Sequence, residues 1–314
     1  VAIGPLMPGP QRKLRDIAPA CKGRARRAAA GGRRSGTAKS LSCPPFSALQ
    51  WIFQQEFQWI FGGQHEIWLS PGAISGSLLE PVGLDSARLG AQAIQAIAAR
   101  CKIEPNLNPI MLKPLGNYYS AIYLNGKYFK KMHAKDYYAK FVKTKGIKVA
   151  TTSLFQLKKN YDLVILEGAG SPAEINLQKF DIANMQIAQK ANASVLLVAD
   201  IDKGGSFASL AGTMTLIEKK YQELVKGFIL NKFRGDIDVL KPGFRKIKQI
   251  TKIPVLGTIP MIKTNLPEED SLNVKAKEIS WTKNNISKID KDLDKLANTV
   301  KNNIDLKTIE KMIK

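Results

Sequence analysis

The stretch that decides the fold is Tyr161-Asp-Leu-Val-Ile-Leu-Glu-Gly-Ala-Gly-Ser-Pro-Ala-Glu-Ile-Asn-Leu177. Its apolar run, 163–166, predicts a buried strand of a parallel sheet, because such strands are covered on both faces. Glu167 and the glycines at 168 and 170 follow, and the carboxyl ends of parallel strands are where α/β sheets bind ligands. A carboxylate there suits Mg²⁺ in a nucleotide site. A glycine-rich turn without a ligand explains this stretch equally well.

Two further strand–helix units follow this first one along the chain. The predicted strands are 163–166, 194–199 and 226–230, the predicted helices after them are 179–192, 207–221 and 237–250, and a last strand is expected at 254–259. This alternation with short loops predicts an α/β fold with a doubly wound, mostly parallel sheet.

Polar side chains come directly after the predicted strands. Right-handed crossovers place the three loops along one edge of the sheet, around a shared crevice. The loops combine metal-binding and phosphate-binding residue types, which favours an active site over ordinary turns. Besides Glu167, the candidates are Asp200, Asp202, Lys203, Asn231, Lys232 and Arg234.

The chain before this region is also regular from about residue 84. The sequence predicts an Ala-rich helix over 86–100, a strand over 109–114 and a helix over 136–159 that breaks near Gly146. Asn125-Gly126 lies between two apolar or aromatic runs, which predicts a β-hairpin.

The composition is that of a globular protein that can bury a sizeable core. The chain has 314 residues, 44% hydrophobic and 24% charged, and no apolar run long enough for a membrane helix. Three widely spaced cysteines and two histidines form neither a disulfide framework nor a zinc site, so we expect a reducing, cytoplasmic setting. The net charge is +22, but the lysines after residue 100 are interleaved with acids. This favours an anionic ligand over nucleic acid.

Residues 1–80 differ from the remainder. The first 40 residues carry ten Lys/Arg and one acid, which is typical of a targeting peptide, a disordered basic arm or foreign sequence. An aromatic motif occurs twice, at 50–53 and 58–61, and could form an amphipathic helix or a strand pair. We expect three parts: an unassigned segment 1–80, a catalytic domain 81–273, and a charged helical tail or linker 274–314 whose apolar stripe is Ile289, Leu293, Leu296, Val300 and Ile304.

Several ordered blocks resemble cobyric acid synthase, a glutamine-dependent amidoligase of cobalamin biosynthesis. The resemblance runs from about 85 to 273 and includes 91–95, 108–114, 167–177, 181–185, 198–205, 226–236 and 266–271. It implies a P-loop fold similar to dethiobiotin synthetase. It also implies that ATP phosphorylates side-chain carboxylates of (adenosyl)cobyrinic acid a,c-diamide and that ammonia converts each acyl phosphate into an amide.

The resemblance also implies roles for individual residues. Glu167 would hold Mg²⁺ and Lys113 would stabilise phosphate charge. Asn231 and Lys232 match an adenine-side element. Asp200 and Lys203 would line the site, and Glu174 and Asn176 could meet the corrinoid. For these last four, loop capping and turn formation are equally good explanations.

Two features depart from the family pattern. The only candidate phosphate loop ends in Lys39-Ser40, with Arg33 and Ala38 where glycines are needed for backbone amides to wrap phosphates. We therefore expect ATP binding to be weak or absent. No cysteine lies beyond Cys101, so ammonia is expected to come from a glutaminase domain or subunit outside this chain. Two alternatives remain: another P-loop amidoligase similar to cobyrinic acid diamide synthase, and a non-catalytic basic protein that binds nucleotide or nucleic acid.

Overall fold

The computed structural model describes residues 59–61, 89–264, 266 and 283–313. Lys39, Ser40 and the first aromatic motif at 50–53 therefore lie outside the described residues. The strands are β1 (Trp59–Phe61), β2 (Ile110–Gly116), β3 (Tyr119–Leu124), β4 (Lys127–His133), β5 (Ile165–Glu167), β6 (Val195–Asp200), β7 (Val225–Phe233) and β8 (Val255–Pro260). The helices are α2 (Leu89–Ala98), α3 (Ala134–Asp136), a π-helical stretch (Tyr137–Gly146), α4 (Ile147–Asn160), α5 (Met185–Ala191), α6 (Ser206–Leu216), α7 (Lys219–Gln222), α8 (Lys241–Thr251), α9 (Lys283–Asn303) and α10 (Leu306–Ile313), with 3₁₀ turns at Pro105–Leu107, Gln178–Phe180 and Ile237–Leu240.

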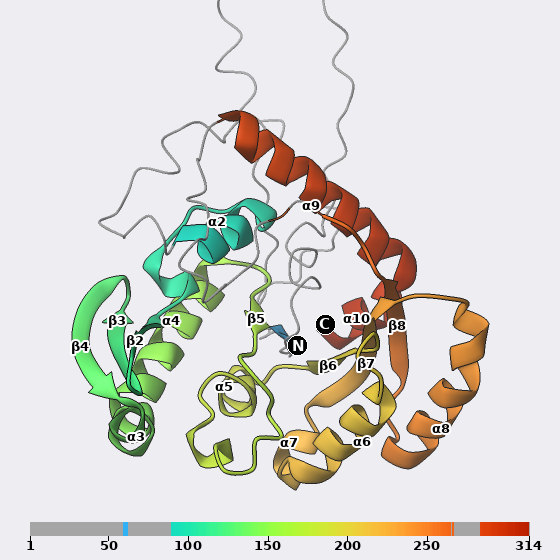
Figure 1. The fold of residues 1–314 in the computed structure, drawn as a ribbon, viewed down its shortest axis with the longest axis horizontal. Coiled ribbons are helices and arrows are strands. Elements are labelled where there is room, and N and C mark those ends of the chain that lie inside the picture. The colour runs from blue at the N-terminus through green and yellow to red at the C-terminus, as the bar shows by residue number, and fades with distance from the viewer. Residues whose placement is uncertain (1–58, 62–88, 265, 267–282, 314) are drawn as a thin grey trace, which may run out of the picture.

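The main sheet has five strands in the order β5-β1-β6-β7-β8 (Figure 1). β6, β7 and β8 are parallel neighbours. β1 pairs antiparallel with both β5 and β6, so β5 runs in the same direction as the other three. The sheet is therefore mostly parallel, as predicted. Residues 59–61 form a single strand of this sheet.

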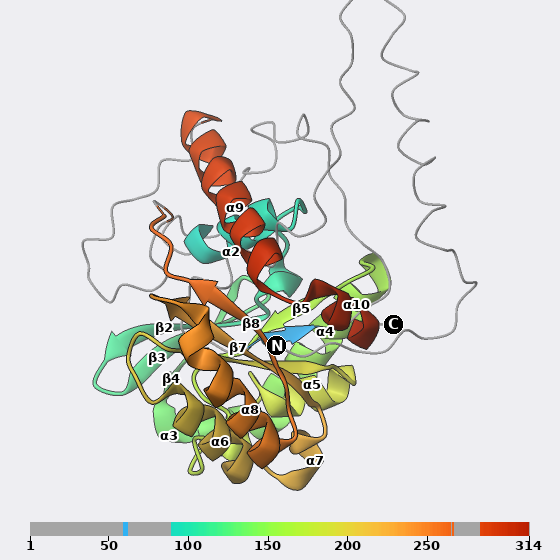
Figure 2. The ribbon, with the colours of Figure 1, turned by 90° about the vertical axis from the view of Figure 1, so that its right-hand side faces the viewer.

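Alternate residues of a strand point to opposite faces of the sheet, so β6 and β7 carry apolar side chains on both faces. Helices cover both faces. Leu196 and Ile229 pack with α2, α9 and α10, while Leu197, Phe228 and Leu230 pack with α4, α5, α6 and α8. Figures 1 and 2 show these two layers on opposite sides of the sheet. The predicted doubly wound α/β fold is confirmed.

The α9 helix covers one face of the sheet through the apolar stripe predicted from the sequence. Ile289, Leu293, Leu296, Val300 and Ile304 are all buried. Two carboxylates of α9, Asp290 and Asp294, also pair with Arg100, which follows α2. The predicted helix is confirmed, and the pairs connect segments that lie about 190 residues apart.

A second, antiparallel sheet contains β2, β3 and β4 in that order. The predicted hairpin turn at Asn125-Gly126 is confirmed, with φ of 46° and 78°, as a two-residue hairpin turn requires. One face of this sheet packs through Ile122 against Tyr137, Phe141 and Val142. The predicted helix over 136–159 changes from π-helical to α-helical geometry at Gly146, where a break was expected.

Several boundaries differ from the sequence prediction. The helix expected over 179–192 is only a 3₁₀ turn followed by α5, because the Asp181 carboxylate accepts the backbone N–H groups of Asn184 and Met185 and starts the helix there. The helix expected over 207–221 is divided into α6 and α7. β7 continues to Phe233, so Asn231 and Lys232 lie in the strand rather than in the following loop. Within the described residues, no helix combines the length and apolar character that a membrane span needs.

Candidate functional site

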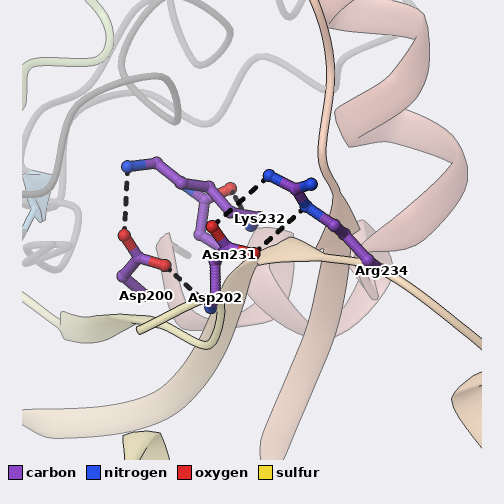
Figure 3. A network of polar contacts seen from close by, with 5 residues as sticks. All are labelled: Asp200, Asp202, Asn231, Lys232 and Arg234. Atoms are coloured by element: carbon purple, nitrogen blue, oxygen red, sulfur yellow. Dashed lines mark hydrogen bonds and ion pairs between the residues drawn. The ribbon is translucent and has the colours of Figure 1, made fainter. Parts of the chain in front are cut away.

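A polar cluster lies at the carboxyl ends of the neighbouring strands β6 and β7 (Figure 3). Asp200 ends β6 and is opposite Asn231 in the register of the two strands. The Lys232 ammonium donates a hydrogen bond to Asp200 Oδ2 over 3.0 Å. Their side chains are 23% and 13% exposed, so this ion pair is partly shielded from water. The structure therefore brings together three of the residues predicted for the site.

Backbone geometry around Asn231 fixes this cluster. The buried Asn231 side chain accepts the Lys232 N–H through Oδ1 over 2.9 Å, and its carbonyl accepts the Ile201 N–H over 3.0 Å. Lys232 has φ of +62°, an uncommon conformation for a residue with a Cβ. It lies between Leu230 and Phe233, where the pairing of β7 with β8 shifts register. The side chain that crosses to β6 thus starts from a strained backbone.

A second acid–base pair extends the cluster outward. Arg234 Nε lies 3.1 Å from Asp202 Oδ1, and a second guanidinium nitrogen lies 3.4 Å from Oδ2. The Asp202 N–H donates to Asp200 Oδ1 over 2.9 Å, which joins the two pairs. Lys203 follows and is exposed. Gly204 and Gly205 then have φ of +76° and +68° before α6 begins, a geometry that favours glycine.

Glu167 is separate from this cluster. It ends β5, and its Oε2 accepts a hydrogen bond of 2.9 Å from the Gln95 amide on α2. Trp59 pairs with Glu167 on one side and with Leu196 on the other, so Glu167 lies level with Leu196. Leu196 is four residues before Asp200 in β6. Four residues of a strand span about 13 Å. The structure thus joins two of the three predicted loops and leaves Glu167 nearer the α2 side.

Gln95 is a site residue that the sequence reasoning missed. The available signal was a polar residue within an Ala-rich apolar helix. By donating to Oε2, Gln95 orients the Glu167 carboxylate. Such a partner sets the direction of a metal-ligating carboxylate.

Asn184 is a second missed residue, and it holds the glycine loop after β5. Its Nδ2 donates to the Ala169 carbonyl over 2.8 Å, and the residue is only 4% exposed. Its Oδ1 is buried and has no hydrogen-bond partner among the described residues. Burial raises the pKa of the neighbouring Asp181 carboxyl above its ordinary value, against the opposing effect of the backbone N–H groups that it accepts. A buried acceptor beside a glycine loop is suited to a ligand that donates a hydrogen bond.

The remaining predicted residues have simpler surroundings. Glu174 and Asn176 are exposed, and the Glu174 carbonyl accepts the N–H groups of Leu177 and Gln178 in a turn. Lys113 is exposed inside β2, in the antiparallel sheet, and not at the end of its strand as expected. Their functional roles stay predictions, as do those of Lys39 and Ser40.

The donors present limit the kind of metal that fits. Among the described residues, no group of three or more His, Cys, Asp or Glu side chains could hold a metal ion. Mg²⁺ commonly takes one or two carboxylates and fills its other positions with phosphate oxygens and water. Glu167 therefore fits a Mg²⁺ that arrives with a nucleotide, and the described residues do not form a cage for a resident metal.

Comparison with known proteins adds the family context. Residues 115–269 match the model of an AAA domain. Three relatives, each named probable cobyric acid synthase, are similar to the chain. The protein of Methanococcus vannielii is 46% identical over 66% of this chain and 44% of its own length. The proteins of Thermococcus kodakarensis and Methanosphaera stadtmanae are 50% and 48% identical over 58% and 60% of this chain, and over 38% of their own lengths.

The predicted resemblance to cobyric acid synthases is confirmed. The AAA-domain match agrees with the P-loop type of fold that the resemblance implied. The chain spans less than half the length of the curated relatives that it matches. No solved structure matches it.

Proposed function

We propose that the chain carries the synthetase activity of a cobyric acid synthase. It would amidate carboxylate side chains of (adenosyl)cobyrinic acid a,c-diamide at the expense of ATP, giving cobyric acid. The observation that carries this proposal is the 46–50% identity with relatives named probable cobyric acid synthase. The polar cluster at the strand ends of an AAA-type sheet supports it, since α/β sheets bind ligands there.

The chemistry requires a substrate carboxylate to be activated before nitrogen can attack. A carboxylate oxygen of the corrinoid bonds to the γ-phosphorus of ATP and ADP leaves, and the nitrogen of ammonia then bonds to the acyl carbon while phosphate leaves. Ammonia would come from a glutaminase domain or subunit that is not part of the described structure. Such phosphoryl transfer depends on positioning and charge neutralisation more than on covalent catalysis.

The chain's own residues would supply those two effects. Glu167, oriented by Gln95, would ligate Mg²⁺, and Lys113 would offset phosphate charge. Asn231 and Lys232 would contact the nucleotide, with Asp200 fixing the lysine. The exposed residues Lys203, Glu174 and Asn176 would meet the substrates, and Lys39 and Ser40 are the candidates for the phosphate loop. We place the reaction in the cytoplasm, because the cysteine pattern suits a reducing compartment.

The test is ATP-dependent amidation of the corrinoid diamide with ammonium as nitrogen donor, followed by mass spectrometry. Glu167→Ala should reduce the rate by about a hundredfold or more, because metal stabilisation of a transition state is worth several kcal/mol. Glu223→Ala, an equal charge change at an exposed position after α7, serves as the control. A wild-type chain that produces no amide from the diamide at saturating ammonium would overturn the proposal.

Two alternatives give different outcomes in the same assay. An enzyme similar to cobyrinic acid diamide synthase would use cobyrinic acid itself and leave the diamide unchanged. A non-catalytic binder would hydrolyse no ATP, and the net charge of +22 is the observation that favours it. Its nucleic-acid affinity should fall steeply with salt.

A further inference from the structure

The antiparallel sheet presents a surface of aromatic and basic side chains on its outer side. Directly paired residues project to the same face of a sheet. The pairs Lys113–Ala121–Lys131, Tyr123–Tyr128 and Tyr119–His133 therefore share one face. The opposite face carries Ile122 and Met132, which pack against the helical segment after β4. We name the outer surface the aromatic–basic face, formed by Lys113, Tyr119, Tyr123, Tyr128, Lys131 and His133.

The rings on this face contact one another and remain accessible. The ring centroids of Tyr123 and Tyr128 are 5.5 Å apart, and those of Tyr119 and His133 are 5.1 Å apart. The Lys131 ammonium lies 4.9 Å from the Tyr119 ring centroid. Tyr128 and Tyr119 are nevertheless 60% and 40% exposed. Apolar surface gathered in this way marks an interaction site more often than scattered exposed residues do.

The charge of this region has one sign. Residues 105–135 contain five lysines and no Asp or Glu, in a chain that has 26 acids in total. Elsewhere in the described structure, lysines such as Lys232 pair with carboxylates of the same chain. The hairpins provide no such carboxylates, so the face is complementary to a ligand that carries several negative charges.

The turn that connects β2 to β3 places a further tyrosine beside the face. Gly116, Asn117 and Tyr118 have φ of 82°, 49° and 60° in succession. Positive φ at both Asn117 and Tyr118 is what a two-residue hairpin turn requires, and the Tyr118 side chain is 82% exposed. The Tyr118 carbonyl accepts the Ala134 N–H over 2.9 Å, which fixes the turn against the end of β4. The ring centroids of Tyr118 and His133 are 6.1 Å apart, so this exposed tyrosine extends the aromatic–basic face.

We propose that the aromatic–basic face is the docking surface for the corrinoid polycarboxylate substrate. Tyrosine rings offer apolar area to the macrocycle and hydroxyl groups to its carboxylates and carboxamides, and the lysines pair with carboxylates that await amidation. Lys113 belongs both to this face and to the predicted catalytic residues, which connects docking with the reaction. Figure 1 shows the three strands at the outer side of the molecule, beyond α4. The inference rests on the proposed function for the identity of the ligand.

The test measures binding of the corrinoid diamide directly, without ATP, by quenching of protein fluorescence and by calorimetry. Lys131→Gln and Tyr128→Ser should each weaken binding, by roughly three- to fivefold, and the double variant by roughly tenfold or more. Lys130→Gln is the matched control, because it removes the same charge from the adjacent residue of β4 on the opposite face of the sheet. It should leave the affinity within about twofold, as expected for a surface charge change away from the ligand.

The outcomes separate this inference from the proposed function. Equal losses in Lys130→Gln and Lys131→Gln would indicate a diffuse charge effect and overturn the docking surface. Unchanged corrinoid affinity together with lost binding of a single-stranded oligonucleotide would assign the face to nucleic acid instead. A wild-type chain that binds the diamide with the predicted variant pattern but never amidates it would refute the proposed function alone. A wild-type chain that does not bind the diamide would refute both.

Discussion

Replacement of Lys232 separates the two effects that act at this position, the ion pair and the backbone strain. Lys232→Ala and Lys232→Gly both remove the 3.0 Å bond to Asp200. The two side chains are 23% and 13% exposed, between the surface and buried cases. We therefore expect each variant to lose about 2 kcal/mol of unfolding free energy, between the ~0–1 of exposed pairs and the ~3–5 of broken buried pairs.

The two variants should differ from each other because of φ. Alanine retains the cost of a left-handed conformation, while glycine adopts φ of +62° freely. Lys232→Gly should thus be more stable than Lys232→Ala by about 0.5–1 kcal/mol, although glycine in a strand is ordinarily the less stable choice.

Urea denaturation followed by circular dichroism measures both differences, and thermal melting checks them at about 2–4 °C per kcal/mol for a domain of this size. The double variant Asp200→Asn, Lys232→Ala, compared with the two single variants, completes a double-mutant cycle that gives the coupling energy of the ion pair. A coupling energy near zero would refute the reasoning about the ion pair. Equal stability of the alanine and glycine variants would refute the reasoning about strain.

Three further results are expected. Gly257→Ala should destabilise the fold by about 2–3 kcal/mol, because the new Cβ would lie 2.5 Å from a backbone oxygen of α9. Gly212→Ala, in open space within α6, should stabilise the fold by about 0.5–1 kcal/mol. Denaturant unfolding of the two variants measures both changes. Burial raises the pKa of the Cys101 thiol from its ordinary 9.0 to about 12. The unfolding free energy should therefore fall as the pH rises above 9.0, the pKa of the thiol in the unfolded chain. In a variant with the other two cysteines replaced by serine, the native Cys101 thiol should resist alkylation at pH 8 until the chain unfolds. Gln95→Leu removes the donor to Glu167, so half-maximal activity should need about tenfold more Mg²⁺, and an unchanged Mg²⁺ requirement would count against Glu167 as the ligand.

Local sequence patterns were sufficient for most of the fold. The apolar runs that became β6 and β8 were placed to within about one residue, because a strand covered on both faces must be apolar throughout. The stripe of α9 was also readable, since residues three or four apart lie on one side of a helix. Boundaries failed where a side chain or a shift in strand register controlled them, as at Asp181 and in β7.

The sequence predicted the positions of the candidate site residues along the chain but not their contacts. The sequence indicated which polar residues lie near the carboxyl ends of the strands, because a polar residue after an apolar run is a local pattern. It could not show that Lys232 crosses to Asp200, that Gln95 holds Glu167, or that Glu167 is offset along the sheet from Asp200. Those facts depend on strand register and on a helix about 70 residues away, which no local pattern encodes.

From the sequence alone, residues 161–177 could be interpreted as a buried strand followed by a carboxylate and glycines. The resemblance to cobyric acid synthase then indicated the reaction. The tertiary structure decided which side chains meet. It separated Lys113 from the strand-end cluster and placed it among tyrosines on a second sheet, because antiparallel pairing sends alternate residues to the same face. The identity of a residue is local information, whereas its neighbours are set by the packing of the whole chain.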